Sequence, residues 1–316
     1  MDNIFEQFVL TETSLRLCLL LVVLILARYV SLSEAYHPGT LLRYLATKLT
    51  VKVNKRDARQ QALSGALSTL LLIASILSLA SAVLYFANVP WFFEALFLFI
   101  AIERNSTIIV AEQLTKSVED NKKALARELL SKICLRDTQS LSMMGICKAA
   151  IEGLVQRPMI HCFNIAFYYA IFGIHIALTV ALINALASNW NPKKRQFRHF
   201  GRVPSQLAQR LNAPIQYIIA LLCGLLFGMR YIKIRTKWHN KAIGAILATT
   251  AQTLNRQLGG AVMYDGIKIR RPMLGTDHVP QAEDIKHVQS FMDKLEQALL
   301  TLFAFSLFAS ILFSNL

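Results

Sequence analysis

Long apolar runs alternate with basic polar segments along the whole chain. The clearest of these runs, residues 62–87, has 26 residues and no charge. Because a helix needs about 20 largely apolar residues to cross the hydrocarbon layer of a membrane, this run predicts a membrane-spanning helix. Three further spans are predicted at residues 15–33, 89–102 and 298–313, the first of them with flanking arginines that reach the interface. The pattern is typical of a multi-pass membrane protein.

Two other apolar segments, residues 158–188 and 213–229, do not fit a simple span. The first has 31 residues, and a single pass through it would place the basic segment that follows on the outer face. We predict instead two short helices that break near Gly173 and enter and leave on the same side. The second has only 17 residues and predicts a half-span or an interfacial segment. Six plain spans are the alternative topology.

The charged residues lie between the apolar runs and predict the topology. The net charge is +15, and residues 189–212 alone carry six Lys and Arg with no acid. Residues 1–14 carry three acids and no base, which argues against a signal peptide. Because basic loops stay in the cytoplasm, we expect the N-terminus outside and the basic loops inside, against anionic lipid. Nucleic acid is not an expected partner, because the basic residues form no stripe interleaved with aromatic residues.

A small β-hairpin is predicted among the helices. Asp265-Gly266 lies between Val262-Met263-Tyr264 and Ile267-Lys268-Ile269, and this residue pair favours a two-residue hairpin turn. From Gln281 a helical pattern runs into the last span. The expected fold class is therefore an all-α polytopic membrane protein with broken or re-entrant helices and a small cytoplasmic β-hairpin near residues 262–269. No internal repeat is found, so residues 1–316 are predicted to form one domain.

A polar turn precedes an amphipathic helix near residue 140. One helical face is apolar, because apolar side chains repeat at intervals of three and four: Leu141, Met144, Cys147, Ile151 and Val155. A second face carries small residues at the same spacing and ends at Glu152: Ser142, Gly145 and Ala149. One interpretation is a helix lying on the membrane surface, capped by Asp137 or Thr138. The other is a face that approaches a second helix or a ligand.

Polar side chains within the apolar runs are further candidates for function. His161, His175 and Glu94 are costly in lipid and so often functional, although a hydrogen bond to a neighbouring helix explains each as well. The run from Lys193 to Arg202 is either an anchor to anionic lipid or a clamp for phosphate or carboxylate groups. The five cysteines show no spacing typical of disulfides or metal sites.

A series of short motifs runs along the chain in a fixed order. The motifs are His37-Pro38, Arg136-Asp137-Thr138 with Leu141, Ala149-Ala150-Ile151-Glu152, Phe167-Tyr168-Tyr169-Ala170 with Gly173, Ile183-Asn184-Ala185-Leu186, Phe200-Gly201-Arg202, Leu258-Gly259-Gly260, Tyr264-Asp265-Gly266, Arg271-Pro272 and Asp284-Ile285. In order and rough spacing, from about residue 20 to 300, they resemble the CobD/CbiB family of cobalamin biosynthesis, the adenosylcobinamide-phosphate synthases.

The resemblance implies a multi-pass enzyme of the bacterial inner membrane, so the outside position expected for the N-terminus from the charges would be the periplasm. Such an enzyme joins a corrinoid substrate, adenosylcobyric acid, to an aminopropanol or its phosphate through an amide, using ATP and Mg²⁺. The resemblance implies Asp137 and Glu152 as catalytic groups. It implies that substrate or phosphate is bound by Arg136, Thr138, Asn184, Arg202 and Asp265. It assigns no metal ligands, and nothing in the sequence indicates the oligomeric state.

The chain departs from the family pattern where the family carries acidic residues. Gly153-Leu154-Val155-Gln156-Arg157-Pro158, Asn184-Ala185-Leu186-Ala187-Ser188 and Leu207-Ala208-Gln209-Arg210 stand where the family has Asp or Glu. One alternative is therefore a non-catalytic relative with a regulatory or assembly role, comparable to the AmpE-like membrane proteins. Another is a transporter, which the broken helices favour and the lack of internal symmetry disfavours.

Overall fold

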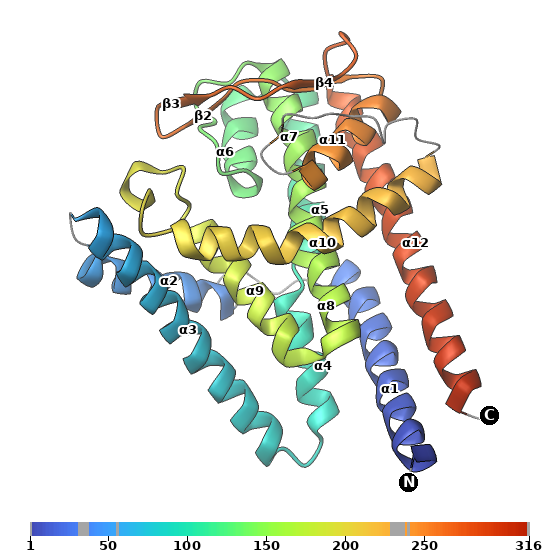
Figure 1. Cartoon of the computed structure of the whole chain (residues 1–316). Coiled ribbons are helices and arrows are strands. Elements are labelled where there is room, and N and C mark those ends of the chain that lie inside the picture. Colours follow the sequence, from blue (N-terminus) through green and yellow to red (C-terminus); the bar gives the residue numbers. More distant parts are fainter. Residues whose placement is uncertain (1, 31–37, 55–56, 228–237, 239–240, 315–316) are drawn as a thin grey trace.

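The computed structural model describes residues 2–30, 38–54, 57–227, 238 and 241–314, with the backbone alone for residues 2–11, 105 and 314 (Figure 1). His37 of the His37-Pro38 motif lies outside the described residues. The helices, in chain order, are α1 (Asp2–Tyr29), α2 (Pro38–Val53), α3 (Ala58–Phe86), α4 (Pro90–Ala101), α5 (Asn105–Glu119), α6 (Lys123–Ile133), α7 (Met143–Pro158), the π-helix η1 (Met159–Phe163), α8 (Asn164–Phe172), α9 (Ile174–Asn189), the 3-10 turn η2 (Arg195–Phe197), α10 (Arg202–Phe227), α11 (Lys241–Thr253) and α12 (Ala282–Ser314).

Among the described residues, three helices are long and apolar enough to cross a membrane: α3, α10 and residues Ala282–Phe313 of α12. They contain the predicted spans at residues 62–87 and 298–313, apart from the final residue of the first. Large apolar side chains such as Leu70 on α3 and Phe305 on α12 are 65% and 69% exposed. A surface of this kind is stable when lipid covers it.

Other predicted membrane segments have different bounds. Residues 89–102 form α4, which has 12 residues and is about 18 Å long, too short to cross the hydrocarbon layer alone. Residues 15–29 of the span predicted at 15–33 lie in α1, which carries Glu12, Arg16 and Arg28 and packs along α12, and residues 31–33 lie outside the described residues. The predicted half-span at 213–229 was too short: α10 begins at Arg202 and has 26 residues.

The predicted break at Gly173 is confirmed. Gly173 has φ 76° and ψ −171° and separates α8 from α9, a backbone conformation that is essentially restricted to glycine. The two helices pack against each other, and the chain reverses direction between them (Figure 1).

The predicted hairpin is also confirmed. Strand β2 (Val262–Tyr264) pairs antiparallel with β3 (Ile267–Ile269). Asp265 and Gly266 have φ of 50° and 75°, as the favoured two-residue turn requires. A second pair, β1 (Gln257–Gly259) with β4 (Met273–Gly275), was not predicted, because strands of three residues carry too little periodicity. The strands lie at the end of the molecule opposite the two chain termini (Figure 1).

Helix α7 lies in the core and not on a surface. Residues on several of its faces are buried, among them Ile146, Ala149, Ile151 and Glu152, and the helix packs against α5, α6 and α12. The expectation of an amphipathic surface helix is therefore wrong. The residue that caps the start of α7 is Ser142, not Asp137 or Thr138 as expected: its Oγ accepts a hydrogen bond from the Gly145 amide at 3.2 Å.

Candidate functional site

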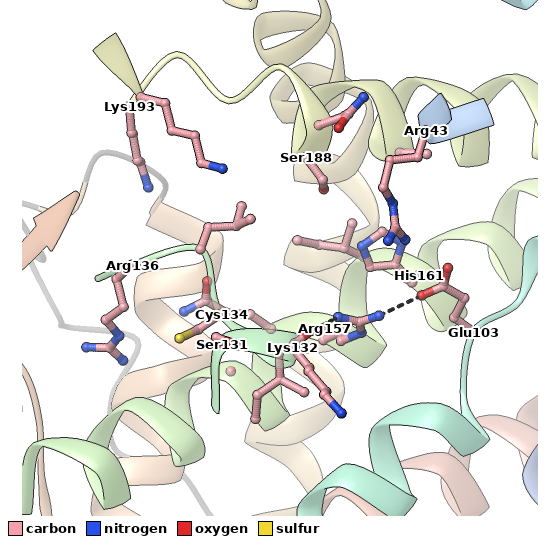
Figure 2. A pocket seen from close by; sticks show the side chains of 18 of the residues that line it. Arg43, Glu103, Ser131, Lys132, Cys134, Arg136, Arg157, His161, Ser188 and Lys193 are labelled. Atoms are coloured by element: carbon pink, nitrogen blue, oxygen red, sulfur yellow. Dashed lines mark hydrogen bonds and ion pairs between the residues drawn. The ribbon is translucent and has the colours of Figure 1, made fainter. Parts of the chain in front are cut away.

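A cavity of about 530 Å³ opens among α2, α6, α7, η1, α9 and the loop that follows α9 (Figure 2). This volume is typical of small-molecule sites. Seven basic side chains and two carboxylates line it: Arg43, Lys132, Arg136, Arg157, Lys193, Lys194 and Arg271, with Glu103 and Glu152. We call it the basic cavity. Its excess of positive charge favours an anionic ligand.

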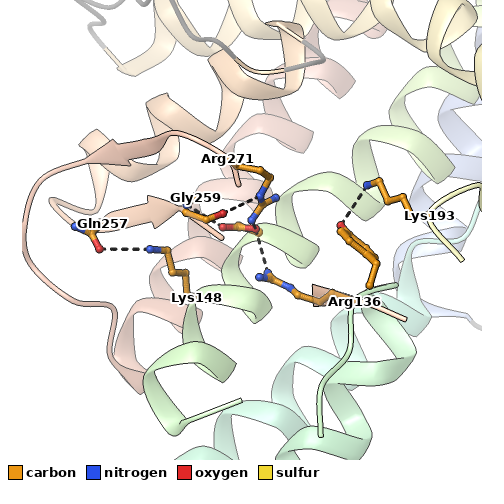
Figure 3. Close-up of polar contacts among 9 residues, drawn as sticks. Arg136, Lys148, Lys193, Gln257, Gly259 and Arg271 are labelled. Carbon is orange, nitrogen blue, oxygen red and sulfur yellow. Dashed lines mark hydrogen bonds and ion pairs between the residues drawn. The ribbon is translucent and has the colours of Figure 1, made fainter. Parts of the chain in front are cut away.

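Glu152 is the most constrained charged residue at the cavity wall. Its side chain is 2% exposed, and its Oε2 accepts hydrogen bonds from Arg136 at 3.0 Å and Arg271 at 2.8 Å. Its Oε1 accepts from the Gly259 amide at 2.9 Å. Gly259 has φ 78°, and a side chain there would collide with the Pro272 carbonyl, so glycine permits this approach. Figure 3 shows the two arginines converging from separate parts of the chain.

Asp137 and Asp265 join the hairpin to the rest of the site. The Asp137 carboxylate accepts hydrogen bonds from the amides of Asp265 and Gly266 at 3.2 and 3.1 Å. Asp265 in turn accepts from the Arg195 amide at 2.9 Å. These contacts hold the turn in place, and neither aspartate lines the cavity. Thr138 is buried, and its carbonyl accepts from the Leu141 amide.

The loop after α9 brings two lysines to the cavity. Lys193 Nζ donates to the Tyr264 hydroxyl at 3.2 Å and lies 4.4 Å from the centre of the Tyr264 ring, a cation–π contact. Lys194 is its neighbour at the cavity wall. Lys193 and Tyr264 thus connect this loop to the hairpin. Together with Arg136 and Arg271 they line one end of the basic cavity; Figure 3 shows Arg136, Lys193 and Arg271 in this region.

A different group forms the other end. Arg157 donates to Glu103 at 2.9 Å and to the Lys132 carbonyl at 2.6 Å. His161, on η1, lies beside them at the wall (Figure 2). Burial lowers the pKa of His161 below its ordinary 6.5; Glu103 opposes this shift and Arg157 reinforces it. On the Arg136 side of the cavity, burial raises the pKa of the Cys134 thiol, with Arg136 opposing this shift, so that thiol stays protonated at neutral pH.

Asn184 and Arg202, like Asp137, Thr138 and Asp265, do not line the cavity. Asn184 is 2% exposed. Its side chain accepts a hydrogen bond from the Asn212 amide at 2.8 Å and donates one back at 3.3 Å, and this pair joins α9 to α10. Arg202 begins α10 and its side chain is exposed, away from the cavity lining. Of the expected residues, the structure therefore brings only Arg136 and Glu152 to the cavity.

Several cavity residues were not singled out in the sequence. Arg271 was part of a motif without an assigned role, and Lys193 began the basic run, for which a clamp for phosphate or carboxylate groups was one of two interpretations. Arg43 and Arg157 gave no signal, because their position depends on contacts between distant segments. Among the described residues, no group of three His, Cys, Asp or Glu side chains is arranged to hold a metal ion.

The sequence profile described as "CobD/Cbib protein" matches residues 20–292. "Cobalamin biosynthesis protein CobD" of Chromobacterium violaceum is 29% identical over 197 residues, 60% of this chain and 62% of that protein. The protein of the same name from Stutzerimonas stutzeri is 26% identical over 256 residues, 79% and 84% of the two chains.

"Cobalamin biosynthesis protein CbiB" of Salmonella typhi is 26% identical over 200 residues, 59% of this chain and 62% of that protein. The matched region thus spans less than two thirds of the Chromobacterium and Salmonella proteins. No solved structure matches the chain.

Proposed function

The chain belongs to the CobD/CbiB family, and on that premise we propose that it acts in cobalamin biosynthesis. The proposed reaction is ATP-dependent formation of an amide between adenosylcobyric acid and an aminopropanol or its phosphate. The names of its relatives support the pathway. The basic cavity is the proposed place of reaction.

The charge of the basic cavity is the observation that carries this proposal. Seven basic side chains against two carboxylates suit a ligand with several negative charges, such as a triphosphate, a phosphorylated amino alcohol or a carboxylate. Both carboxylates are already paired with arginines, Glu103 with Arg157 and Glu152 with Arg136 and Arg271. The lining therefore presents net positive charge to the ligand. Hydrogen bonds from Arg and Lys to phosphate are charge-assisted, so they are shorter and stronger than hydrogen bonds between neutral groups.

The residues present fit phosphate better than a protein-held metal ion. Mg²⁺ prefers carboxylate oxygens in octahedral geometry, and both cavity carboxylates are occupied by arginines. The described residues offer no cluster of three metal-ligating side chains. We therefore assign no residue to Mg²⁺ and derive no step from it. Bound ATP would supply the phosphoryl group that activates a corrinoid carboxylate.

The chain's own residues would position the reactants. Lys193, Lys194 and Arg136 would hold the transferred phosphate and balance its charge. Glu152 keeps the guanidinium groups of Arg136 and Arg271 pointing at the same place, so that less freedom is lost when the ligand binds. Glu152 in this arrangement is a positioning residue, and its hydrogen bonds leave it poorly suited to act as the catalytic base.

Complementation and a matched pair of variants test the proposal. We expect the wild-type gene to restore growth on cobyric acid to a strain that lacks the synthase, and the purified protein to form the amide when given ATP. Lys193→Ala should weaken binding of aminopropanol phosphate or ATP about tenfold or more, because a charge-assisted hydrogen bond contributes about 1.5–3 kcal/mol. Arg202→Ala, outside the cavity, should leave binding within about twofold. Failure to complement at good expression would overturn the enzymatic function.

One specific observation favours a second function, that of a non-catalytic relative. Among the described residues, both carboxylates at the cavity wall have an arginine partner, whereas the family pattern carries additional acids in three segments. A protein that binds phosphorylated ligands without joining them would bind ATP or aminopropanol phosphate, lose that binding in Lys193→Ala, and fail to complement.

A further inference from the structure

An unusual turn of backbone carries a histidine to the wall of the basic cavity. Pro158 ends α7 and has no N–H to donate, and the next five residues, Met159–Phe163, form the wide π-helical turn η1. The amide of Asn164 donates to the Met159 carbonyl, five residues back. Single π-turns within helices are frequent at functional sites. His161 is at the middle of this turn and lines the cavity.

Charged residues lie close to His161 at this end of the basic cavity. The Glu103 amide donates to the His161 carbonyl at 3.1 Å, which fixes the segment before α5 against η1. The Glu103 carboxylate accepts from Arg157 at 2.9 Å, and Arg157 also donates to the Lys132 carbonyl. Arg43 of α2 faces the same part of the cavity (Figure 2). Among the described residues, none makes a hydrogen bond to the His161 ring.

These surroundings keep the imidazole neutral and able to accept a proton. Burial is the main cause of the lowered pKa of His161, and Arg157 acts in the same direction. Glu103 acts in the opposite direction and would stabilise the imidazolium once a proton arrives. A neutral imidazole with a nearby carboxylate is a common form of general base.

We propose that His161 is the general base that deprotonates the amine of the amino alcohol as it attacks the activated corrinoid carboxylate. The proposal rests on the proposed function and adds a catalytic residue to it. The amine nitrogen bonds to the carbonyl carbon of the acyl phosphate, and the carbon–oxygen bond to the phosphate breaks. The phosphate leaves with the electron pair and the His161 ring takes the proton. Arg157 and Arg43 lie at this end of the cavity, where they would bind the carboxylate before its activation.

The chain offers a matched control. His175 lies in the same apolar region, but its ring contacts Ser81 Oγ at 3.1 Å and does not line the cavity. We compare His161→Gln with His175→Gln in three assays on the full-length protein: ATP binding, amide formation with aminopropanol phosphate, and hydroxamate formation with hydroxylamine. Hydroxylamine is uncharged at neutral pH and attacks an acyl phosphate without needing a base.

We expect His161→Gln to bind ATP as the wild type does and to form hydroxamate within about threefold of the wild-type rate. Its amide formation should fall about 100-fold or more, because general base catalysis contributes roughly 10²–10⁴-fold. The amide rate of the variant should also lose the part of the fall at acidic pH that protonation of His161 would cause, and keep the part that protonation of the amine itself causes. His175→Gln should match the wild type in all three assays.

Two results would overturn the assignment of His161 while leaving the proposed function intact. One is wild-type amide formation by His161→Gln. The other is an equal loss of amide and hydroxamate, which would place His161 in activation or folding and not in transfer to the amine. If the wild-type protein forms neither product, the proposed function itself fails, and the assignment of His161 fails with it.

Discussion

Glu152 and Arg271 are 119 positions apart in the sequence, yet Arg271 donates to the Glu152 carboxylate at 2.8 Å. Arg136 donates to the same oxygen, and the Gly259 amide to the other. One buried carboxylate therefore ties α7 to β1, to the segment after α6 and to the segment before β4. Removing it would leave two guanidinium groups without their shared partner.

We predict that Glu152→Gln lowers the free energy of unfolding by about 3 kcal/mol, because breaking a buried ion pair on one side costs about 3–5 kcal/mol. Thermal unfolding in detergent measures this. The control is Glu119→Gln, whose partner Lys286 is 60% exposed, and which should cost less than about 1 kcal/mol. Similar losses in the two variants would contradict a structural role for Glu152.

Asp137 should matter for the hairpin turn. Its carboxylate accepts from the amides of Asp265 and Gly266, so Asp137→Ala should destabilise the turn by about 1–2 kcal/mol. Hydrogen exchange of those two amides measures the change directly, and both should exchange about tenfold faster. Asp277→Ala, at an exposed position, should leave their exchange unchanged. Unaltered protection in Asp137→Ala would show that the turn is stable without this contact.

Local signals in the sequence predicted several elements correctly. The uncharged run at 62–87 and the Asp265-Gly266 pair each contain the physical cause of their structure within a few residues, and both are found as α3 and as the β2–β3 turn. Gly173 is similar, since only glycine adopts its backbone conformation readily. The first half of α10 was missed because Gln209 and Arg210 interrupt its apolar pattern.

The site was harder to predict, because its residues come from distant segments. Arg43 and Arg157 reach the cavity only after α2, α7 and η1 have packed together. The resemblance implies Asn184 and Arg202 as binding residues; in this fold Asn184 joins two helices, and Arg202 is exposed and outside the cavity lining. A motif identifies residues that a family shares, and contacts are needed to show what each one does in this chain.

Gly173 should be intolerant of a side chain. With φ 76° and ψ −171°, alanine at this position should cost about 1–3 kcal/mol, and its Cβ would approach the Arg16 guanidinium at 3.4 Å. Gly173→Ala should therefore unfold at a lower denaturant concentration. Gly145→Ala, in the first turn of α7, should be close to neutral, because alanine favours helix and its Cβ would lie 3.3 Å from Leu141 Cδ2, the movable end of a side chain. If Gly173→Ala were as stable as the wild type, the break between α8 and α9 would not depend on glycine.

The amide pair Asn184–Asn212 should show strong energetic coupling. Each side chain is buried and hydrogen-bonded to the other. Asn184→Leu alone leaves Asn212 without this partner and should cost about 1–3 kcal/mol. The double variant Asn184→Leu/Asn212→Leu should recover most of that loss, since replacing both partners by apolar groups is often nearly neutral. A double-mutant cycle measures the coupling, and additive losses would contradict it.

Stability should depend on pH through His161. Burial lowers the pKa of this group in the folded state below its ordinary 6.5, with Glu103, Arg157 and Arg43 as the charged groups facing it. Below about pH 6.5 the unfolded chain therefore binds a proton that the folded chain does not, so stability falls as the pH falls, by at most about 1.4 kcal/mol per pH unit for one proton. Thermal unfolding of His161→Gln between pH 7.5 and 5.5 should show a smaller decline than the wild type, with His175→Gln following the wild type. If the stability of His161→Gln and of the wild type fell equally with pH, the His161 ring would be protonated to the same extent in the folded and unfolded states. It would then not be the neutral imidazole that a general base at this position requires.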